Sequence, residues 1–288
     1  MKPARLLLLL LASSSLALAA DPGQLAAAKA LFDQRKLPEA RSAFEKLAAA
    51  DPRDAEITFY LGELARRRGE LAQAIELLGQ ASAAAPNVGR YSHALGDAAG
   101  EAAQKANVFS QLGLAKKSRL AYEKAVELEP ANVPYRRSLL VFYRQAPGFV
   151  GGGMDKAYAQ AEAIRQLDPA AGRIETAGLY VAEKKYPEAF ALYDAALQDS
   201  PDDYILLYQF GRLAAIAGQQ LDRGSAALEK CLTLAPPPNS PGHAAAHTRL
   251  GNLWEKKGDK AAARAAYEAA LKLEPAFKPA LDSLKALK

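Results

Sequence analysis

Two groups of residues in this sequence have types and a spacing that could form a binding site, one for a metal ion and one for an anion. The first is the pair His243 and His247, which on a helix would present two imidazole nitrogens on one face, as a zinc site needs. Three alanines separate them, so the acidic residue of an HExxH motif is missing, and His93 is the only other histidine. We therefore predict no metal site and no cofactor, and expect His247 to fill a packing position.

The second group is a glycine run that precedes a helix expected to open at Met154-Asp155. Glycine loops before helix N-termini bind phosphates through backbone N–H groups. An anion site here would use the residues of this loop and two lysines earlier in the chain: Phe149, Gly151, Gly152, Gly153, Lys116 and Lys117.

Two features of the same stretch disfavour an anion. Gly148-x4-Gly153 is followed by Met-Asp rather than by the Lys-Ser/Thr of a P-loop, and Asp155 would repel a negative ligand. The alternative is that Phe149 and Val150 pack against a long hairpin expected from the enlarged preceding repeat, while the glycines permit a tight turn.

No arrangement of a nucleophile with a general base is present, and no GxSxG motif occurs. Cys231 is the only cysteine, so an internal disulfide is impossible, and we expect it to be a small buried residue at a helix crossing. We predict that the chain is not an enzyme.

The elements that must position these residues are visible in the stretch from His247 to Pro275. Its first part, His247-x2-Leu250-Gly251-x2-Trp254, has the i, i+3, i+4, i+7 spacing of one helix face. Gly258-Asp259 breaks that helix, and a second helix carries Ala263-x3-Tyr267 before it ends ahead of Pro275. Such a hairpin cannot bury its apolar faces alone, so it must stack on neighbours.

The second-helix pattern occurs seven times, each time with a proline eight residues after its second position. A small residue occupies the first position every time, as a close helix crossing requires. The pairs are Ala40/Phe44, Ala74/Leu78, Ser118/Tyr122, Ala157/Ala161, Ala189/Tyr193, Gly224/Leu228 and Ala263/Tyr267.

These motifs resemble the tetratricopeptide repeat, whose signature is W-x2-L-G-x2-Y…A-x3-F…P over about 34 residues. The LGLAKK and APGFVGGG stretches resemble those of exported bacterial members. The resemblance implies an all-α, right-handed superhelical solenoid of about seven hairpins with a C-terminal capping helix. The expected repeats span approximately 21–54, 55–88, 89–132, 133–169, 170–203, 204–238 and 244–277, with the cap at 278–288.

Two adjacent repeats are enlarged in the turn between their helices. The third carries ten extra residues within 100–119, rich in helix formers with one weak break near Asn107 to Gly113. We expect it to lengthen both helices by about 7 Å each at 1.5 Å per residue. The fourth carries five extra residues in the loop-like stretch 146–153, and a proline-rich spacer, 236–242, precedes the last repeat.

The family resemblance also implies a concave groove lined by the first helices, which binds a segment of a partner protein. The side chains expected there are offset by one position from the buried ones, and Arg and Tyr are frequent anchors of binding sites. The candidates are Arg137, Arg144, Tyr208, Arg212 and Asn252. The alternative function is a ligand-binding or enzymatic module that uses the enlarged edge of repeats 3 and 4.

The N-terminus predicts export. Lys2 and Arg5 precede a short apolar run, and Ala17-Leu18-Ala19 is a small-x-small cleavage site, so residues 1–20 are expected to be a signal peptide. An uncleaved anchor is the alternative, and a periplasmic or secreted location is expected. The net charge of +5 is spread along the chain, which gives nucleic-acid binding little support.

Overall fold

The computed structural model describes residues 21–238 and 240–287. The expected signal peptide lies outside these residues. The described chain consists of fifteen α-helices and one short 3₁₀ helix, with no strand among the described residues. It divides into two compact units, of which the first ends at Pro130 and the second begins at Ala131.

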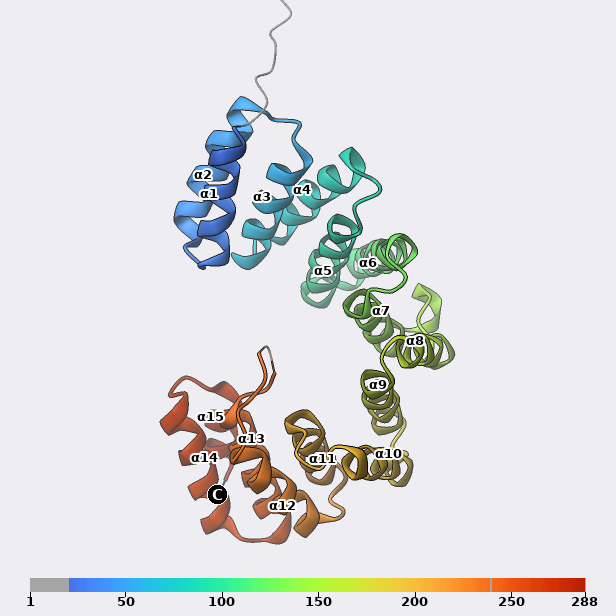
Figure 1. Cartoon of the computed structure of the whole chain (residues 1–288), viewed down its shortest axis with the longest axis vertical. Helices are drawn as coiled ribbons and strands as arrows, with labels where there is room; N and C mark the ends of the chain where they lie inside the picture. Colours follow the sequence, from blue (N-terminus) through green and yellow to red (C-terminus); the bar gives the residue numbers. More distant parts are fainter. Residues whose placement is uncertain (1–20, 239, 288) are drawn as a thin grey trace, which may run out of the picture. The chain divides into compact units, whose positions relative to one another are not determined.

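Unit 1 contains three helical hairpins (Figure 1). Its helices are α1 (Pro22–Asp33), α2 (Leu37–Ala50), α3 (Ala55–Arg67), α4 (Leu71–Ala84), α5 (Gly89–Lys105) and α6 (Val108–Leu128). Helices α1 and α2, α3 and α4, and α5 and α6 pack in pairs, and α3 also contacts α5.

Unit 2 continues the same alternation. Its helices are α7 (Val133–Gln145), η1 (Gly148–Val150), α8 (Met154–Leu167), α9 (Pro169–Ala182), α10 (Tyr186–Asp199), α11 (Tyr204–Ala217), α12 (Leu221–Leu232), α13 (His243–Lys257), α14 (Lys260–Leu273) and α15 (Lys278–Ala286). Each first helix packs on the second helix of its own hairpin, and α11 also lies against α13. The helical repeat architecture expected from the sequence is therefore present.

The hairpins close because a small residue on one helix faces a large one on the other. A methyl group added at Gly62 would lie 2.7 Å from Leu78 Cγ, and one at Gly251 would lie 2.4 Å from Tyr267 Cε1. Leu78 and Tyr267 are both fully buried. The glycines let the two helices approach closely enough for these side chains to fill the crossing.

The fourth hairpin reverses this arrangement. Leu140 of α7 and Ala161 of α8 occupy the corresponding positions, and both are at most 1% exposed. The large residue is on the first helix and the small one is on the second. The summed volume at the crossing is thus maintained, which is what a closely packed interior requires.

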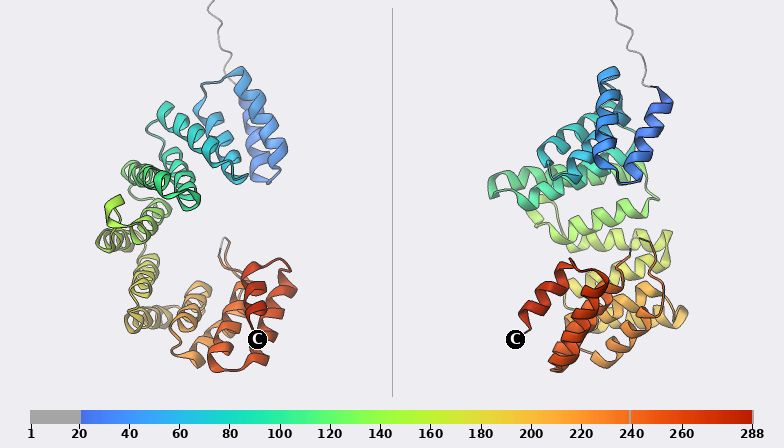
Figure 2. Two further views of the ribbon diagram at one scale, coloured as in Figure 1. Left: turned by 180° about the vertical axis from the view of Figure 1, so that it is seen from behind. Right: turned by 90° about the vertical axis from the view of Figure 1, so that its left-hand side faces the viewer.

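The insertion of repeat 3 lengthens both helices, as expected, but unequally. Helix α5 has 17 residues and α6 has 21, whereas α3 has 13 and α4 has 14. The break is narrower than the sequence suggested: it occupies Ala106 and Asn107, and Gly113 is inside α6. Asn107 caps α6 by accepting hydrogen bonds from the N–H groups of Phe109 and Ser110. Figure 2 shows the two helices side by side, in green.

The proline-rich segment between α12 and α13 is fixed to unit 2 at both of its ends. The hydroxyl of Tyr204 donates to the carbonyl of Pro241 at 2.7 Å, and Nε2 of His243 lies 2.8 Å from the carbonyl oxygen of Leu234. At the C-terminal end, α15 packs on α13 and α14 and buries Leu287 against Ala263 and Tyr267. The expected capping helix is therefore present.

Candidate partner-binding surface

The first helices of the hairpins carry mostly polar side chains next to the positions that are buried within their own hairpin. We call this surface of α1, α3 and α5 the first-helix face of unit 1. It is defined by Lys29, Glu56, Phe59, Glu63, Arg66, Arg90, His93, Asp97 and Glu101. The charges on this face are arranged in two networks.

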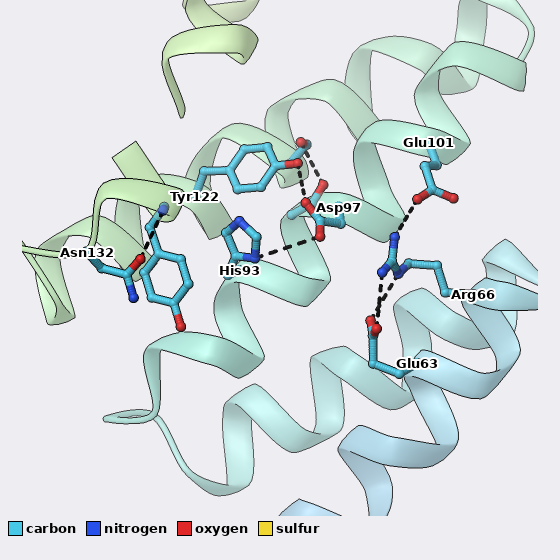
Figure 3. A network of polar contacts seen from close by, with 10 residues as sticks. Glu63, Arg66, His93, Asp97, Glu101, Tyr122 and Asn132 are labelled. Carbon is cyan, nitrogen blue, oxygen red and sulfur yellow. Dashed lines mark hydrogen bonds and ion pairs between the residues drawn. The ribbon is translucent and has the colours of Figure 1, made fainter. Parts of the chain in front are cut away.

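The first network is centred on Arg66 (Figure 3). Its guanidinium donates to both carboxylate oxygens of Glu63, at 3.0 and 3.1 Å, and to Glu101 of α5 at 2.6 Å. Burial lowers the pKa of Arg66, but the hydrogen bonds with the two carboxylates outweigh burial and raise that pKa. Glu63, with 8% of its surface exposed, is thus a buried acid with a charged partner.

Figure 3 also shows the carboxylate of Asp97, which lies between α5 and α6. The hydroxyl of Tyr122 donates to its Oδ1 at 2.8 Å, and Nδ1 of His93 lies 3.7 Å from its Oδ2. Burial raises the pKa of Asp97, against the opposite effects of His93, Tyr122 and Arg66. Burial and the nearby Asp97 also raise the pKa of the Tyr122 hydroxyl.

The second network is centred on Glu56 and joins all three first helices of unit 1. Oε1 of Glu56 accepts from Nζ of Lys29 and from Arg90, each at 2.9 Å. The Arg90 guanidinium also lies 5.3 Å from the ring centre of Phe59 and 5.0 Å from that of Tyr91. Charges on this face are largely matched within the unit, which makes it a fixed polar surface with few cations free for a partner.

The first-helix face of unit 2, on α7, α9, α11 and α13, is more cationic. Arg137 donates to Glu175 of α9 at 2.5 Å, and the side-chain amide of Asn252 donates to the hydroxyl of Tyr267 at 2.8 Å. Arg212 reaches only the amide oxygen of Gln209, at 3.4 Å. No ion pair joins Arg144, Arg212, Arg249 or Lys256 to an acid within the described part of unit 2.

Tyr208 does not lie on an open face. It is 5% exposed and belongs to the hydrophobic core of unit 2, so its expected role as a groove anchor is corrected. An offset of one position turns a side chain by about 100° around the helix. Helix α11 packs on α10, α12 and α13, so that rotation leaves Tyr208 within the core.

A shallow hollow of about 420 Å³ opens on this face between α11 and α13. It combines a half-exposed aliphatic side chain with cationic and amide groups. Its lining residues are Ala215, Ile216, Arg249, Asn252, Glu255 and Lys256. Only Asn252 was among the sequence candidates. Arg249 and Lys256 each lie two positions after a residue of the repeat pattern, His247 and Trp254. A prediction that also counted positions offset by two would have included them.

The three glycines of the loop between α7 and α8 use their own N–H groups for hydrogen bonds within the turn. The N–H groups of Gly151, Gly152 and Gly153 donate to the carbonyls of Gly148, Pro147 and Tyr143, at 2.9, 3.1 and 2.8 Å. Gly151 has φ 92°, and a methyl group on Gly152 would lie 1.8 Å from the carbonyl oxygen of Ala146. The glycines therefore permit a tight turn.

The side chains flanking that turn differ from each other. Val150 is buried, whereas Phe149 is 81% exposed, so the expectation that both pack is wrong for Phe149. Lys116 and Lys117 are exposed on α6 in unit 1. Nζ of Lys156 donates to the carbonyl of Gly151 at 2.9 Å, a cation at this loop that the sequence did not suggest.

The other two residues singled out in the sequence, His247 and Cys231, are packed within unit 2. His247 is half-buried, and burial together with His243 lowers its pKa. Cys231 is fully buried with its sulfur 3.7 Å from the carbonyl of Tyr204. Across the described ranges, no group of three or more His, Cys, Asp or Glu side chains is placed to hold a metal ion. None of the helices in those ranges is long and apolar enough to span a bilayer.

Models of the tetratricopeptide repeat match residues 25–89, 103–132 and 244–277. The chain is a tetratricopeptide repeat protein. Each match falls on consecutive helices of the structure, including the lengthened α6. Such repeats form protein–protein interaction scaffolds in general. No curated protein sequence matches this chain significantly.

Solved structures share the repeat architecture at low identity. A tetratricopeptide repeat protein from Parabacteroides merdae is 17% identical, with 92% of this chain and 97% of that one covered, at a TM-score of 0.68. The C-terminal part of a repeat-containing protein from Cytophaga hutchinsonii is 17% identical, with 90% and 98% covered, at 0.51. The human IFIT1 dimer with m7Gppp-AAAA is 19% identical, with 87% and 58% covered, at 0.57. These likenesses show the fold alone.

Proposed function

We propose that this protein is a non-enzymatic interaction scaffold that binds an acidic segment of a partner protein on the first-helix face of unit 2. The observation that carries the proposal is the hollow between α11 and α13. It offers the apolar side chain of Ile216, which is 41% exposed, beside Arg249 and Lys256. An apolar side chain surrounded by cationic groups is complementary to a partner segment in which an apolar side chain is flanked by carboxylates.

The charges of the neighbouring helices support the same partner chemistry. Glu175 is paired with Arg137, and the hollow itself holds two cations, Arg249 and Lys256, against one acid, Glu255, which accepts from the Tyr267 hydroxyl. Arg144 and Arg212 therefore add positive charge to the surface on which the hollow opens. Charge complementarity of this kind mainly accelerates association and selects between partners.

The test is photo-crosslinking in the producing cell, with the crosslinking residue placed at Ile216 and mass spectrometry of what is attached. A partner peptide rich in Asp and Glu is expected there. Arg212→Glu combined with Arg249→Glu should reduce capture at least tenfold. Arg264→Glu combined with Lys272→Glu, the same total charge change on two exposed residues of α14, is the matched control.

Unchanged capture by the double variant would contradict the proposed surface. Loss of capture on deleting Phe149 to Gly153, with the double variant unaffected, would move the site to the loop between α7 and α8. This result would favour the alternative in which the enlarged repeats bind the ligand.

We further propose that the protein acts after export, on the basis of the basic, apolar and small-residue pattern of residues 1–20. Mass spectrometry of the N-terminal peptide of the protein purified from its producing cell tests this. A mature N-terminus close to Asp21 in the exported fraction is expected. Full-length protein confined to the cytosol would contradict export.

A further inference from the structure

The N-terminal part of α6 exposes apolar side chains that no other described segment of unit 1 covers. Phe109 is 95% exposed, Val108 80% and Leu112 49%, and Leu120 further along the helix is 50% exposed. Isolated exposed apolar residues are common, but a group on one helix is not. This group occurs where the ten-residue insertion extends the α5–α6 hairpin.

These residues share one side of the helix. Phe109, Leu112, Lys116 and Leu120 follow the i, i+3, i+7, i+11 spacing of a single stripe, and Val108 and Lys117 lie at its two borders. The opposite side of α6 is buried against α5 through Ser118, Ala121 and Ala125. The outward stripe is therefore apolar and basic where a solvent-facing helix side is normally polar and of mixed charge.

The charge around the stripe has one sign. From Ala102 to Tyr122 the chain contains no Asp or Glu but has four cations, Lys105, Lys116, Lys117 and Arg119. Arg119 is engaged by Glu123 at 2.8 Å. Lys105, Lys116 and Lys117 are exposed beside the apolar side chains. They supply three positive charges, and the nearest acids in sequence have cationic partners of their own: Glu101 accepts from Arg66 and Glu123 from Arg119.

We propose that the tip of the α5–α6 hairpin binds an anionic lipid surface. Phe109, Val108 and Leu112 enter the boundary between headgroups and acyl chains, and the three lysines contact the anionic headgroups. A helix side with aromatic and aliphatic residues flanked by lysines is the composition of interfacial, non-spanning membrane contacts. Lysine stems can cover apolar surface while their ammonium groups reach the headgroup level.

A lipid surface fits this tip better than a protein groove does. The apolar side chains project from the end of a hairpin, and Gly113 beside them has no atom within 4 Å of where a methyl group would lie. Fluid lipid accommodates a convex apolar projection without a matching cavity. Because the contact is peripheral, it needs no spanning helix and is independent of the partner surface proposed on unit 2.

The expected lipid preference follows from the lysines. Each contributes a factor of about five in affinity for an anionic over a neutral surface at low salt, so three contribute roughly a hundredfold. Lys116→Gln with Lys117→Gln should therefore lower binding to anionic vesicles about 25-fold. Phe109→Ser with Leu112→Ser should weaken binding at least tenfold, because each removes buried apolar contact.

The decisive measurement places a fluorescent probe at the tip, so that any contact made elsewhere in the chain is not counted. Trp254 is the only native tryptophan, and replacing it by Phe allows Phe109→Trp to be the sole reporter. Vesicles are made of phosphatidylcholine with 30 mol% brominated phosphatidylglycerol, or of brominated phosphatidylcholine alone. Phe149→Trp in the same background is the matched control, because Phe149 is also an exposed aromatic.

Quenching and a blue shift of the Phe109→Trp reporter with anionic vesicles only, and an unaffected control reporter, would support the proposal. Absence of quenching at position 109 would overturn it, as would equal quenching of both reporters or equal quenching by neutral vesicles. Capture of an acidic protein through position 109 without quenching by vesicles would also overturn it, in favour of a protein partner.

Discussion

The hydroxyl of Tyr122 donates a hydrogen bond to the carboxylate of Asp97 across 2.8 Å and thereby joins α6 to α5 at the first-helix face of unit 1. Tyr122→Phe removes this donor and leaves a largely buried carboxylate with one contact fewer. Hydrogen bonds to charged groups contribute about 1.5–3 kcal/mol, so we expect a loss near the lower limit of that range. Urea unfolding of the two proteins at pH 7 measures it, and equal midpoints would contradict it.

The same carboxylate predicts a pH dependence of a definite sign. Burial raises the pKa of Asp97 in the folded protein above the unfolded value of about 3.9. Its contribution to stability is therefore fully present below that unfolded value and is lost as pH rises through the folded pKa. Asp97→Asn should be more stable than the wild type at pH 7, because the asparagine oxygen still accepts from Tyr122. The difference should shrink as pH falls toward 4, and a constant difference would contradict this assignment.

The crossing of α3 and α4 predicts opposite effects for the same substitution at two glycines. In Gly62→Ala the new methyl group would lie 2.7 Å from Leu78 Cγ, whereas in Gly79→Ala it would meet no atom within 4 Å. We expect Gly62→Ala to destabilise unit 1 by roughly 1–3 kcal/mol through overpacking. Gly79→Ala should stabilise it by about 0.5–1 kcal/mol through helix propensity. Thermal unfolding compares them, and effects of the same sign would contradict this packing.

Most of the helical order follows from sequence because one short-range rule repeats. Ala40 and Ala263 are small residues four positions before large ones, Phe44 and Tyr267, and all four side chains are fully buried. The partner surface follows less well, since its exposure depends on which neighbours each helix packs against. Tyr208 satisfies the pattern of an outward residue and is nevertheless in the core. Ile216 belongs to no sequence motif, and yet it lines the hollow.

The role of the glycine loop between α7 and α8 could not be decided from the sequence either. The glycines after Phe149 favour both an anion site and a tight turn, and only the destination of their N–H groups distinguishes the two. Because the relevant carbonyls belong to Tyr143, Pro147 and Gly148, the answer depends on how the end of α7 meets the loop. Sequence spacing does not contain that geometry.

This loop gives a prediction with an internal control. In Gly152→Ala the new methyl group would lie 1.8 Å from the carbonyl oxygen of Ala146, but in Gly148→Ala it would meet no atom within 4 Å. We expect Gly152→Ala to destabilise unit 2 by about 1–3 kcal/mol, through backbone displacement. Gly148→Ala should be nearly neutral. Titration calorimetry with inorganic phosphate should show no binding by either variant or by the wild type, and saturable binding by the wild type would restore the anion hypothesis.

His247 predicts a loss of stability in mild acid. Burial and the neighbouring His243 lower its pKa below the ordinary value of about 6.5. The unfolded chain therefore takes up the proton first, and stability falls as pH decreases through 6.5 toward the folded pKa. His247→Gln should flatten the dependence of the unfolding midpoint between pH 7 and 5. An unchanged slope in this variant would exclude His247 as its source.

Cys231 provides a chemical measure of the opening of unit 2. Its side chain is fully buried, and burial raises the pKa of its thiol, which lowers the reactive thiolate fraction in the folded protein. Because it is the only cysteine, every labelling event reports this position. We expect a disulfide reagent at pH 8 to react at least a hundredfold more slowly with the native protein than in 6 M urea. The native rate should follow the equilibrium population of opened unit 2, so Gly211→Ala, whose methyl would lie 2.3 Å from Leu228 Cγ, should accelerate it. Labelling of the native protein at the rate of the unfolded chain would show that α11 and α12 do not enclose Cys231 in solution.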